Sequence, residues 1–243
     1  MLNSYCFLSS IIKEYSESKL KKMKVPHKDI SLSQKNFIWW LWWIIAGLVV
    51  IHLTLQAVHY YVQELPWLLR EIFDVDEEES FSTWFSAVLL LICSALLFLI
   101  AWYKESYTRH WYGLAIGFCI LSLDEVVGMH ETFNTITEIA WTVPATWITL
   151  LLLLLYLKFL IYLPRPAMKL FLIAGTVFLS GGLLVEHLAD YYVEVFGMDN
   201  FGYQLLTALE ESLEMVGVVL FIRALLKFLA ADNTDTVTIK INI

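Results

Sequence analysis

The sequence predicts an all-α polytopic membrane protein with six transmembrane helices. Of the 243 residues, 59% are hydrophobic and only 16% are charged, whereas a soluble domain typically carries about 25% charged residues. Such a composition cannot cover a soluble surface with polar groups, and it excludes a disordered chain or a disulfide-rich domain. The length accommodates roughly six spans of about 20 residues each, but not these together with a large soluble domain.

Six apolar segments are long enough to cross a bilayer, and turn-forming or capping residues separate them. Ser82 and Thr83 are predicted to cap the second helix, and Pro144 suits the first turn of the fourth. Pro164 separates the fourth helix from the fifth. The predicted spans are residues 37–59, 83–103, 111–131, 144–163, 167–189 and 203–229.

The distribution of Lys and Arg predicts that both termini are cytoplasmic. With six spans, fifteen of the 16 Lys and Arg residues fall on the side of the termini, and only Arg70 falls on the other. Short cytoplasmic loops of membrane proteins carry such an excess of positive charge. We therefore predict a basic cytoplasmic tail in residues 1–36, a transmembrane domain in residues 37–229 and a cytoplasmic C-terminal tail in residues 230–243.

The connection between the first two spans, residues 60–82, has an apolar part followed by an acidic stretch. The apolar part, with Trp67 as an anchor, is predicted to lie in the membrane interface as an amphipathic helix. The acidic stretch, residues 74–79, has the composition of a weak Ca²⁺ site. It lacks the glycine-containing spacing and the distal Glu of a calcium loop, so we interpret it as a solvated patch.

Ionisable side chains occur inside four of the spans, although an Asp, Lys or Arg at a helix centre costs about 2.5–3.5 kcal/mol on insertion scales. A helical rise of about 1.5 Å per residue places these side chains in one layer in the outer half of the membrane. Spans 2 and 4 contribute none, so we expect a core bundle of helices 1, 3, 5 and 6 with helices 2 and 4 peripheral. The layer comprises His52 on span 1, Asp124, Glu125, His130 and Glu131 on span 3, Glu186, His187 and Asp190 on span 5, and Glu210, Glu211 and Glu214 on span 6.

No Lys or Arg lies in this layer, so the carboxylates would repel one another in a medium of low dielectric constant. Protons, a bound metal or a water-filled cleft must therefore compensate their charge. Glu, Asp and His from facing helices hold the metals of carboxylate di-iron and di-manganese bundles, and they also bind zinc. All residues of the layer are thus candidate ligands of divalent metal, Zn or Fe, and Glu125 and Glu211 are the candidate catalytic groups.

Two features limit this assignment. The Glu-x-x-His spacing of the soluble di-iron bundles is absent, so likeness to those proteins is an analogy in ligand type alone. A lone histidine on an apolar helix is commonly a structural core residue, and for His52 this alternative stays open.

The leading hypothesis is a metal-dependent enzyme that acts on a lipid or other apolar substrate at the outer leaflet. A hydrolytic version would use a zinc-bound water with one carboxylate as general base, and an oxidative version would use a pair of redox metals. The alternative is a proton- or cation-coupled transporter or channel. Few polar residues continue an ion path through the cytoplasmic halves of the spans, and only Gly181 and Gly182 hint at a broken helix.

Three motifs, DVDEEESFSTWFSA, DEVVGMHE and EESLEM, resemble those of an uncharacterised group of bacterial inner-membrane proteins of similar length. The resemblance covers most of the chain from the first span to the sixth. It implies a multi-pass protein of the bacterial inner membrane and no particular activity. We accordingly expect membrane lipids around the protein and no nucleic-acid partner.

Overall fold

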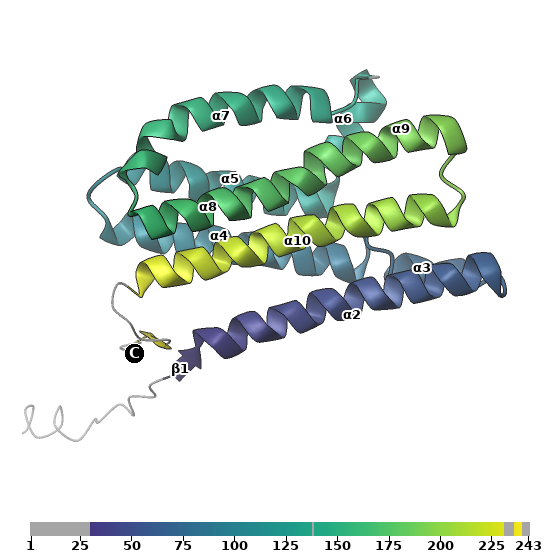
Figure 1. Ribbon diagram of the computed structural model, residues 1–243, viewed down its shortest axis with the longest axis horizontal. Helices are drawn as coiled ribbons and strands as arrows, with labels where there is room; N and C mark the ends of the chain where they lie inside the picture. Colours follow the sequence, from purple (N-terminus) through teal and green to yellow (C-terminus); the bar gives the residue numbers. More distant parts are fainter. Residues whose placement is uncertain (1–29, 138, 231–235, 240–243) are drawn as a thin grey trace, which may run out of the picture.

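The computed structural model describes residues 30–137, 139–230 and 236–239. Within these residues the chain is helical apart from one two-stranded sheet, and the long helices run roughly antiparallel in a single bundle (Figure 1). Most of the predicted basic tail lies outside the described residues. Its last part forms β1 (Ile30–Ser33) and the first turn of α2, which begins at Gln34.

The first two predicted spans are present as α2 (Gln34–Tyr61) and α4 (Phe81–Tyr103), with the short helix α3 (Trp67–Ile72) between them. Trp67 is 67% exposed, and its role as an interfacial anchor stays a prediction. The N-cap of α4 is Ser80, whose Oγ accepts a hydrogen bond from the Thr83 amide at 3.2 Å. The cap therefore lies two residues before the predicted Ser82, because the oxygen of Ser80 reaches the unpaired amide of the first turn.

The third predicted span consists of two helices, α5 (Thr108–Val127) and α6 (Met129–Thr137). They are separated by Gly128, which has a φ of 59°. This left-handed conformation is readily adopted by glycine and ends the helix. The prediction of one helix over residues 111–131 is therefore wrong at its C-terminal end.

The remaining helices are α7 (Thr142–Tyr162), α8 (Arg165–Leu179), α9 (Glu186–Phe196) and α10 (Phe201–Leu229). A π-helical turn, η1 (Ser180–Val185), joins α8 to α9, so that the fifth predicted span is one continuous run, Arg165–Phe196. The π-turn contains the Gly181-Gly182 pair. Proline and glycine residues thus predict the order of these elements. The structure starts each of the three spans two residues before its predicted start, and only the fifth runs beyond its predicted end.

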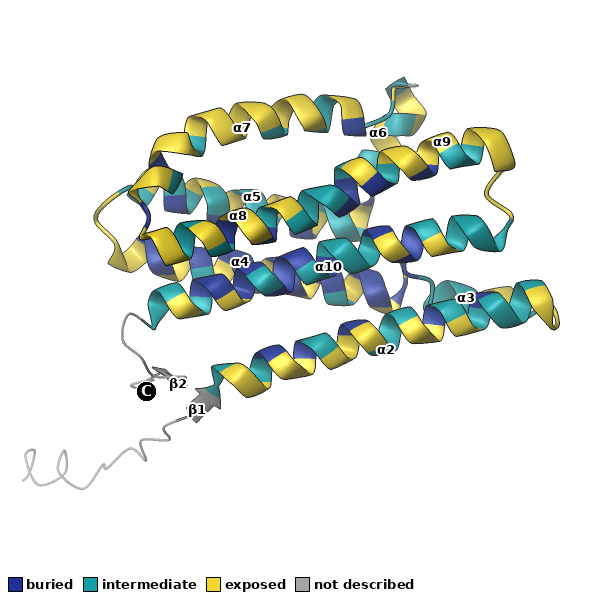
Figure 2. Cartoon of the chain, viewed as in Figure 1, coloured by how far each residue is buried: buried dark blue, intermediate teal, exposed yellow. Residues whose placement is uncertain are grey.

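Helix α10 occupies the centre of the bundle, where it contacts α2, α4, α8, η1 and α9. Half of the most apolar window of α4 is buried, compared with 6% for that of α7. In Figure 2, α10 and much of α4 are buried, whereas α7 is largely exposed. The prediction that the fourth helix is peripheral is confirmed, and the same prediction for the second helix is wrong.

The burial of α4 follows from small and hydroxyl side chains that allow close approach to its neighbours. Ser94 Oγ donates a hydrogen bond to the Ala115 carbonyl on α5 at 2.8 Å. Ser122 Oγ on α5 donates to the Ala87 carbonyl on α4, also at 2.8 Å. Small residues and hydroxyl groups are the usual means of helix association in membranes. A search for ionisable residues alone does not detect this type of contact.

Five helices are long and apolar enough to cross a membrane: α2, α4, α5, α7 and the continuous run Arg165–Phe196. These five candidate spans indicate a multi-pass membrane protein. Helix α10 has 29 residues but is not one of the five. Its charged residues, Glu210, Glu211, Glu214, Arg223 and Lys227, are spread so that no long stretch of the helix has two or fewer of them, whereas each of the five contains such a stretch. The count of six spans stays a prediction.

The two strands lie at one end of the bundle. β1 pairs antiparallel with β2 (Thr236–Ile239), with Ile30 opposite Ile239 and Ser33 opposite Thr236. Because β1 precedes α2 and β2 follows α10, the start of α2 and the end of α10 lie at the same end of the bundle (Figure 1). The predicted C-terminal tail therefore contains a short strand.

Candidate functional site

The predicted acidic layer lies around the N-terminal half of α10, away from the end that carries the two strands. Glu214 lies within electrostatic range of Glu125 and Asp124 of α5 and of Glu186 of α9. Glu211 interacts in the same way with Glu214, Glu125 and Glu210. The structure thus brings together carboxylates from three helices, as the sequence predicts.

Helix α5 and the short helix α6 meet in a carboxylate–histidine pair. The His130 amide donates a hydrogen bond to Asp124 Oδ1 at 3.2 Å, and His130 Nδ1 lies 3.0 Å from Asp124 Oδ2. On one straight helix these residues would point in different directions. The left-handed turn at Gly128 folds His130 back onto Asp124, and this is a contact that helical spacing does not predict.

A tryptophan continues this network towards α9. The indole of Trp141, at the start of α7, lies 5.1 Å from the His130 ring, measured between ring centroids. Its Nε1–H donates a hydrogen bond to Glu186 Oε1. Trp141 therefore joins the histidine of α6 to the carboxylate of α9. No pattern in the sequence indicates this role, because a tryptophan at a helix end in a membrane protein is typical of an interfacial anchor.

The π-turn η1 packs against the same part of α10. A Cβ atom added to Gly181 would lie 2.7 Å from the Glu210 carbonyl oxygen, and one added to Gly182 would lie 2.2 Å from Glu214 Oε1. Only glycine permits this approach of the two backbones. Single π-turns within α-helices are frequent at functional sites, and this one contacts two of the predicted ligands.

The acidic loop before α4 also reaches the site, and its interpretation as a solvated patch is wrong for part of its length. Asp76 is exposed, yet Tyr203 of α10 donates a hydrogen bond to its Oδ2 at 3.3 Å. Asp76 also lies within electrostatic range of Glu210 and Glu211. Glu78 is half-buried, and its Oε1 would lie 1.4 Å from a Cβ added to Gly128. The loop bends inwards because α4 starts at the buried Ser80, a few residues later.

Some predicted ligands do not join the cluster. His52 is buried on α2, and its charged partner is Asp74 of the acidic loop, with 3.4 Å between His52 Nδ1 and Asp74 Oδ1. His187 and Asp190 are exposed on α9, although Asp190 still lies within electrostatic range of Glu186 and Glu210. The side chain of Glu131 lies outside the described part of the structure.

The described side chains are not arranged as a complete set of metal ligands. Among the residues that the structure describes, no three His, Cys, Asp or Glu side chains are arranged to hold one ion. Within the same residues, the two carboxylate ion pairs are both with histidine, His52 with Asp74 and His130 with Asp124. Of these two pairs, the one between His130 and Asp124 belongs to the cluster.

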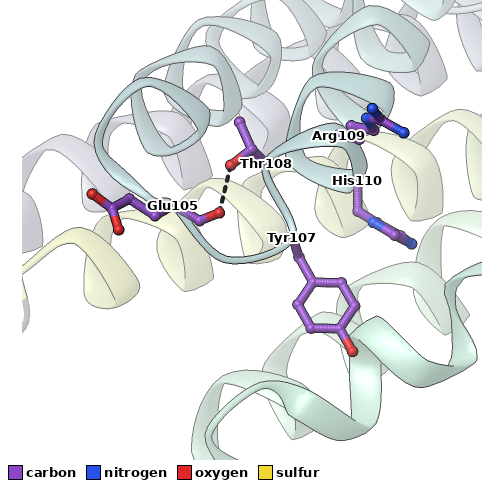
Figure 3. A pocket seen from close by; sticks show the side chains of 5 residues that line it. All are labelled: Glu105, Tyr107, Thr108, Arg109 and His110. Atoms are coloured by element: carbon purple, nitrogen blue, oxygen red, sulfur yellow. Dashed lines mark hydrogen bonds between the residues drawn. The ribbon is translucent and has the colours of Figure 1, made fainter.

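Two surface hollows lie away from these acids. One is formed at the α4–α5 connection by Glu105, Tyr107, Thr108, Arg109 and His110 (Figure 3). Another lies along one face of α2, between Val50 and Val62. The Thr108 hydroxyl donates a hydrogen bond to the Glu105 carbonyl at 2.9 Å, which Figure 3 marks as a dashed line. Tyr107, the N-cap residue of α5, has a φ of 57°. This hollow is therefore a tight turn between two helices, and no predicted site residue lines it.

The fold and the acidic cluster define a multi-pass membrane protein with a polar site inside its helical bundle. A family described as a domain of unknown function (DUF8692) matches residues 40–228. The chain belongs to this family, which covers the region from α2 to α10. Searches of curated proteins and of solved structures returned no match.

Proposed function

We propose that this protein binds divalent metal at the acidic cluster around α10 and is a metal-dependent enzyme that acts on a lipid or other apolar substrate. The observation that carries the proposal is the convergence of Glu125, Glu186 and Glu214 from three helices, with no Lys or Arg beside them in the described residues. A buried carboxylate cluster of this kind requires a compensating cation or protons. Zn and Fe are the metals that suit carboxylate and imidazole ligands.

The proposed membrane arrangement has six spans, with α10 as the sixth and both termini in the cytoplasm of a bacterial cell. The pairing of β1 with β2 supports an even number of crossings, because it holds the start of α2 and the end of α10 together. The bias of Lys and Arg gives the direction. In this arrangement the acidic cluster lies in the outer half of the membrane.

The residues of the cluster would have different roles in such an enzyme. A bound divalent ion would supply Lewis acidity and an activated water or a redox centre. Asp124 orients the imidazole of His130, as carboxylates commonly orient metal-ligating histidines. Trp141 fixes Glu186 through its indole N–H. Glu125 and Glu211 are proposed to move protons, and Glu125 is held near the Ser86 hydroxyl of α4.

The test is the metal content of the purified protein. After purification without chelators, elemental analysis is expected to find close to stoichiometric Zn or Fe in the natural protein. Glu214→Gln is expected to lose this metal, since it removes a carboxylate that three other acids surround. Glu105→Gln, at the exposed α4–α5 connection, is the matched control and should retain it. Only trace metal in the natural protein would contradict the proposal.

Transport of protons or cations is the second candidate function, and the π-turn η1 is the observation that favours it. An interrupted helix beside acidic residues is a feature of ion-coupled transporters. The core between the cluster and the strand end of the bundle is apolar, however, with Leu97, Val219 and Ile222 fully buried there. Ion flux in proteoliposomes that Glu211→Gln abolishes would favour transport over the enzyme.

A further inference from the structure

The acidic loop, residues 74–79, brings an exposed carboxylate against the buried cluster. Five of its six residues are acidic, and Asp76 is exposed. It nevertheless lies within electrostatic range of Glu186 of α9 and of Glu210 and Glu211 of α10. Asp76 therefore connects the cluster to the end of the bundle opposite the strands, where α3 and the start of α10 lie (Figure 1).

One face of α10 leads from Asp76 into the cluster. The Tyr203 hydroxyl donates a hydrogen bond to Asp76 Oδ2 at 3.3 Å. Tyr203, Glu210 and Glu214 are spaced at i, i+7 and i+11, so they lie on the same side of the helix. A rise of about 1.5 Å per residue places Glu210 about 10 Å and Glu214 about 16 Å further along α10 than Tyr203. Glu210 is only 8% exposed, and it interacts electrostatically with both Asp76 and Glu214.

Buried polar atoms beside this face favour water at the same end of the bundle. His52 and Gln56 of α2 are each 1% exposed. Both ring nitrogens of His52 and the Oε1 of Gln56 make no hydrogen bond to any described residue. A buried water with two or more such partners is a normal part of a protein interior. Asp74, which accepts a hydrogen bond from Gln56 Nε2 at 2.9 Å, lies within electrostatic range of Tyr203. The region suited to water therefore adjoins this face of α10.

The other approaches to the cluster are apolar. Towards the strand end, Leu97, Val219 and Ile222 are fully buried. An ion from that end would lose its water without polar groups to replace it. An ion from the side would have to cross the hydrocarbon of the bilayer, which is costly for a charge. Along the face of α10 that begins at Asp76, carboxylate and hydroxyl groups can take the place of the water.

We propose that divalent cations enter the acidic cluster from the aqueous phase at the acidic loop and pass along this face of α10, from Asp76 by way of Glu210 to Glu214. The proposal rests on the metal site of the proposed function and adds its route of entry. Like charges gathered at one place raise the local concentration of the opposite ion and speed its association. Asp76 lies at the start of the route and is not a ligand of the bound ion. It therefore sets the rate of binding and not the number of ions bound.

The experiment measures the rate at which Zn²⁺ binds to the full-length chain in an uncharged detergent, after a chelator has removed bound metal. Stopped-flow mixing with a fluorescent zinc indicator gives the rate, and titration gives the number of ions bound. We expect Asp76→Asn to bind as many Zn²⁺ ions as the natural protein but about ten times more slowly, at the low end of the effect of electrostatic steering. The asparagine oxygen can still accept the hydrogen bond of Tyr203, so the loop keeps its position.

Two further variants test whether the effect belongs to Asp76. Glu79→Gln removes the same charge from an exposed position of the same loop and is the matched control. It should slow binding by less than about twofold, because salt screens exposed charges beyond about 10 Å. Asp190→Asn tests a route past α9, since Asp190 is also exposed and within electrostatic range of Glu186 and Glu210. It should slow binding less than Asp76→Asn does.

The outcomes separate the route of entry from the metal site itself. Equal rates for the natural protein and Asp76→Asn overturn the route and leave the metal site in place. Fewer ions bound by Asp76→Asn also overturn it, because Asp76 would then be a ligand. Slowing by Glu79→Gln or Asp190→Asn that is as large as the slowing by Asp76→Asn overturns the assignment of the route to Asp76. If the natural protein binds neither Zn²⁺ nor Fe²⁺, the proposed function is overturned, and the route with it.

Discussion

Two features of the structure require a residue without a side chain at Gly128. Its φ of 59° is left-handed, and the carboxylate of Glu78 occupies the space where a Cβ would lie. The same turn lets His130 reach Asp124. Gly128 therefore sets the geometry of the carboxylate–histidine pair and the position of the acidic loop.

We predict that Gly128→Ala lowers the melting temperature of the purified protein. A left-handed alanine costs about 1–2 kcal/mol, and the Glu78 carboxylate would also have to move. Gly117→Ala on α5 is the control, because nothing lies within 4 Å of its added Cβ. The control should be neutral or slightly stabilising, since alanine favours a helix interior over glycine. Equal melting temperatures for the two variants would contradict the strain described for Gly128.

At the scale of residues, the sequence predicts which side chains form the acidic layer, but it does not predict which pairs of side chains contact each other. Asp124, Glu125 and Glu214 were predicted to share one layer, and the structure places them within electrostatic range of one another. The partnership of Asp124 with His130 depends on a turn that helical periodicity cannot describe. The partnership of Asp74 with Gln56 joins residues 18 apart through a loop, and no local pattern specifies it.

At the scale of elements, glycines allow α10 to pack closely against both η1 and α8. An added Cβ would lie 2.7 Å from the Glu210 carbonyl at Gly181, and 2.6 Å from the Phe178 backbone nitrogen at Gly217. In both cases the obstacle is backbone, which cannot rotate away as a side chain can. Close helix contacts through small residues are typical of membrane bundles.

We predict that Gly181→Ala and Gly217→Ala each separate α10 from its neighbour and destabilise the protein by about 1–3 kcal/mol, the usual cost of overpacking. Gly175→Ala on α8 is the control, since its added Cβ has no neighbour within 4 Å. Thermal unfolding in detergent gives the comparison. The Gly181 variant should also lose metal at the α10 site, because the Glu210–Glu214 turn would shift. Unchanged stability in both variants would mean that α10 does not pack as described.

The position of α4 in the bundle cannot be predicted from the composition of the helix. Its lack of ionisable residues in the acidic layer led to the prediction of a peripheral helix. Burial of α4 depends instead on Ser94 and Ser122, whose hydroxyls pair with backbone carbonyls across the α4–α5 contact. Apolar length predicts that α4 spans the membrane, but only the spacing of its small residues tells where it lies in the bundle.

The whole molecule is polar inside at one end and apolar inside at the other. His52, Gln56 and Glu210 are buried towards the end that carries α3, α6 and α9. Towards the strand end the buried residues include Leu97, Ile222 and Leu225. A charged group in the apolar half would have to leave its polar partners, which is costly in a membrane. This asymmetry places the buried polar groups at one end of the bundle, and the topology decides which side of the bilayer that end faces.

The topology is the last prediction. If α10 is the sixth span, a reporter fused after Ile243 should be cytoplasmic, and so should a cysteine label at Glu105 in the α4–α5 connection. A label at Glu64, between α2 and α3, should react from outside the cell. The reason is that β1 and β2 pair, which holds the ends of α2 and α10 on one side, while Lys and Arg favour the cytoplasm. Accessibility to an impermeant thiol reagent in intact cells, in a background without the natural cysteines, makes the measurement. An extracytoplasmic reporter after Ile243 would require an odd number of crossings, and α10 would then lie in the bundle without crossing the membrane.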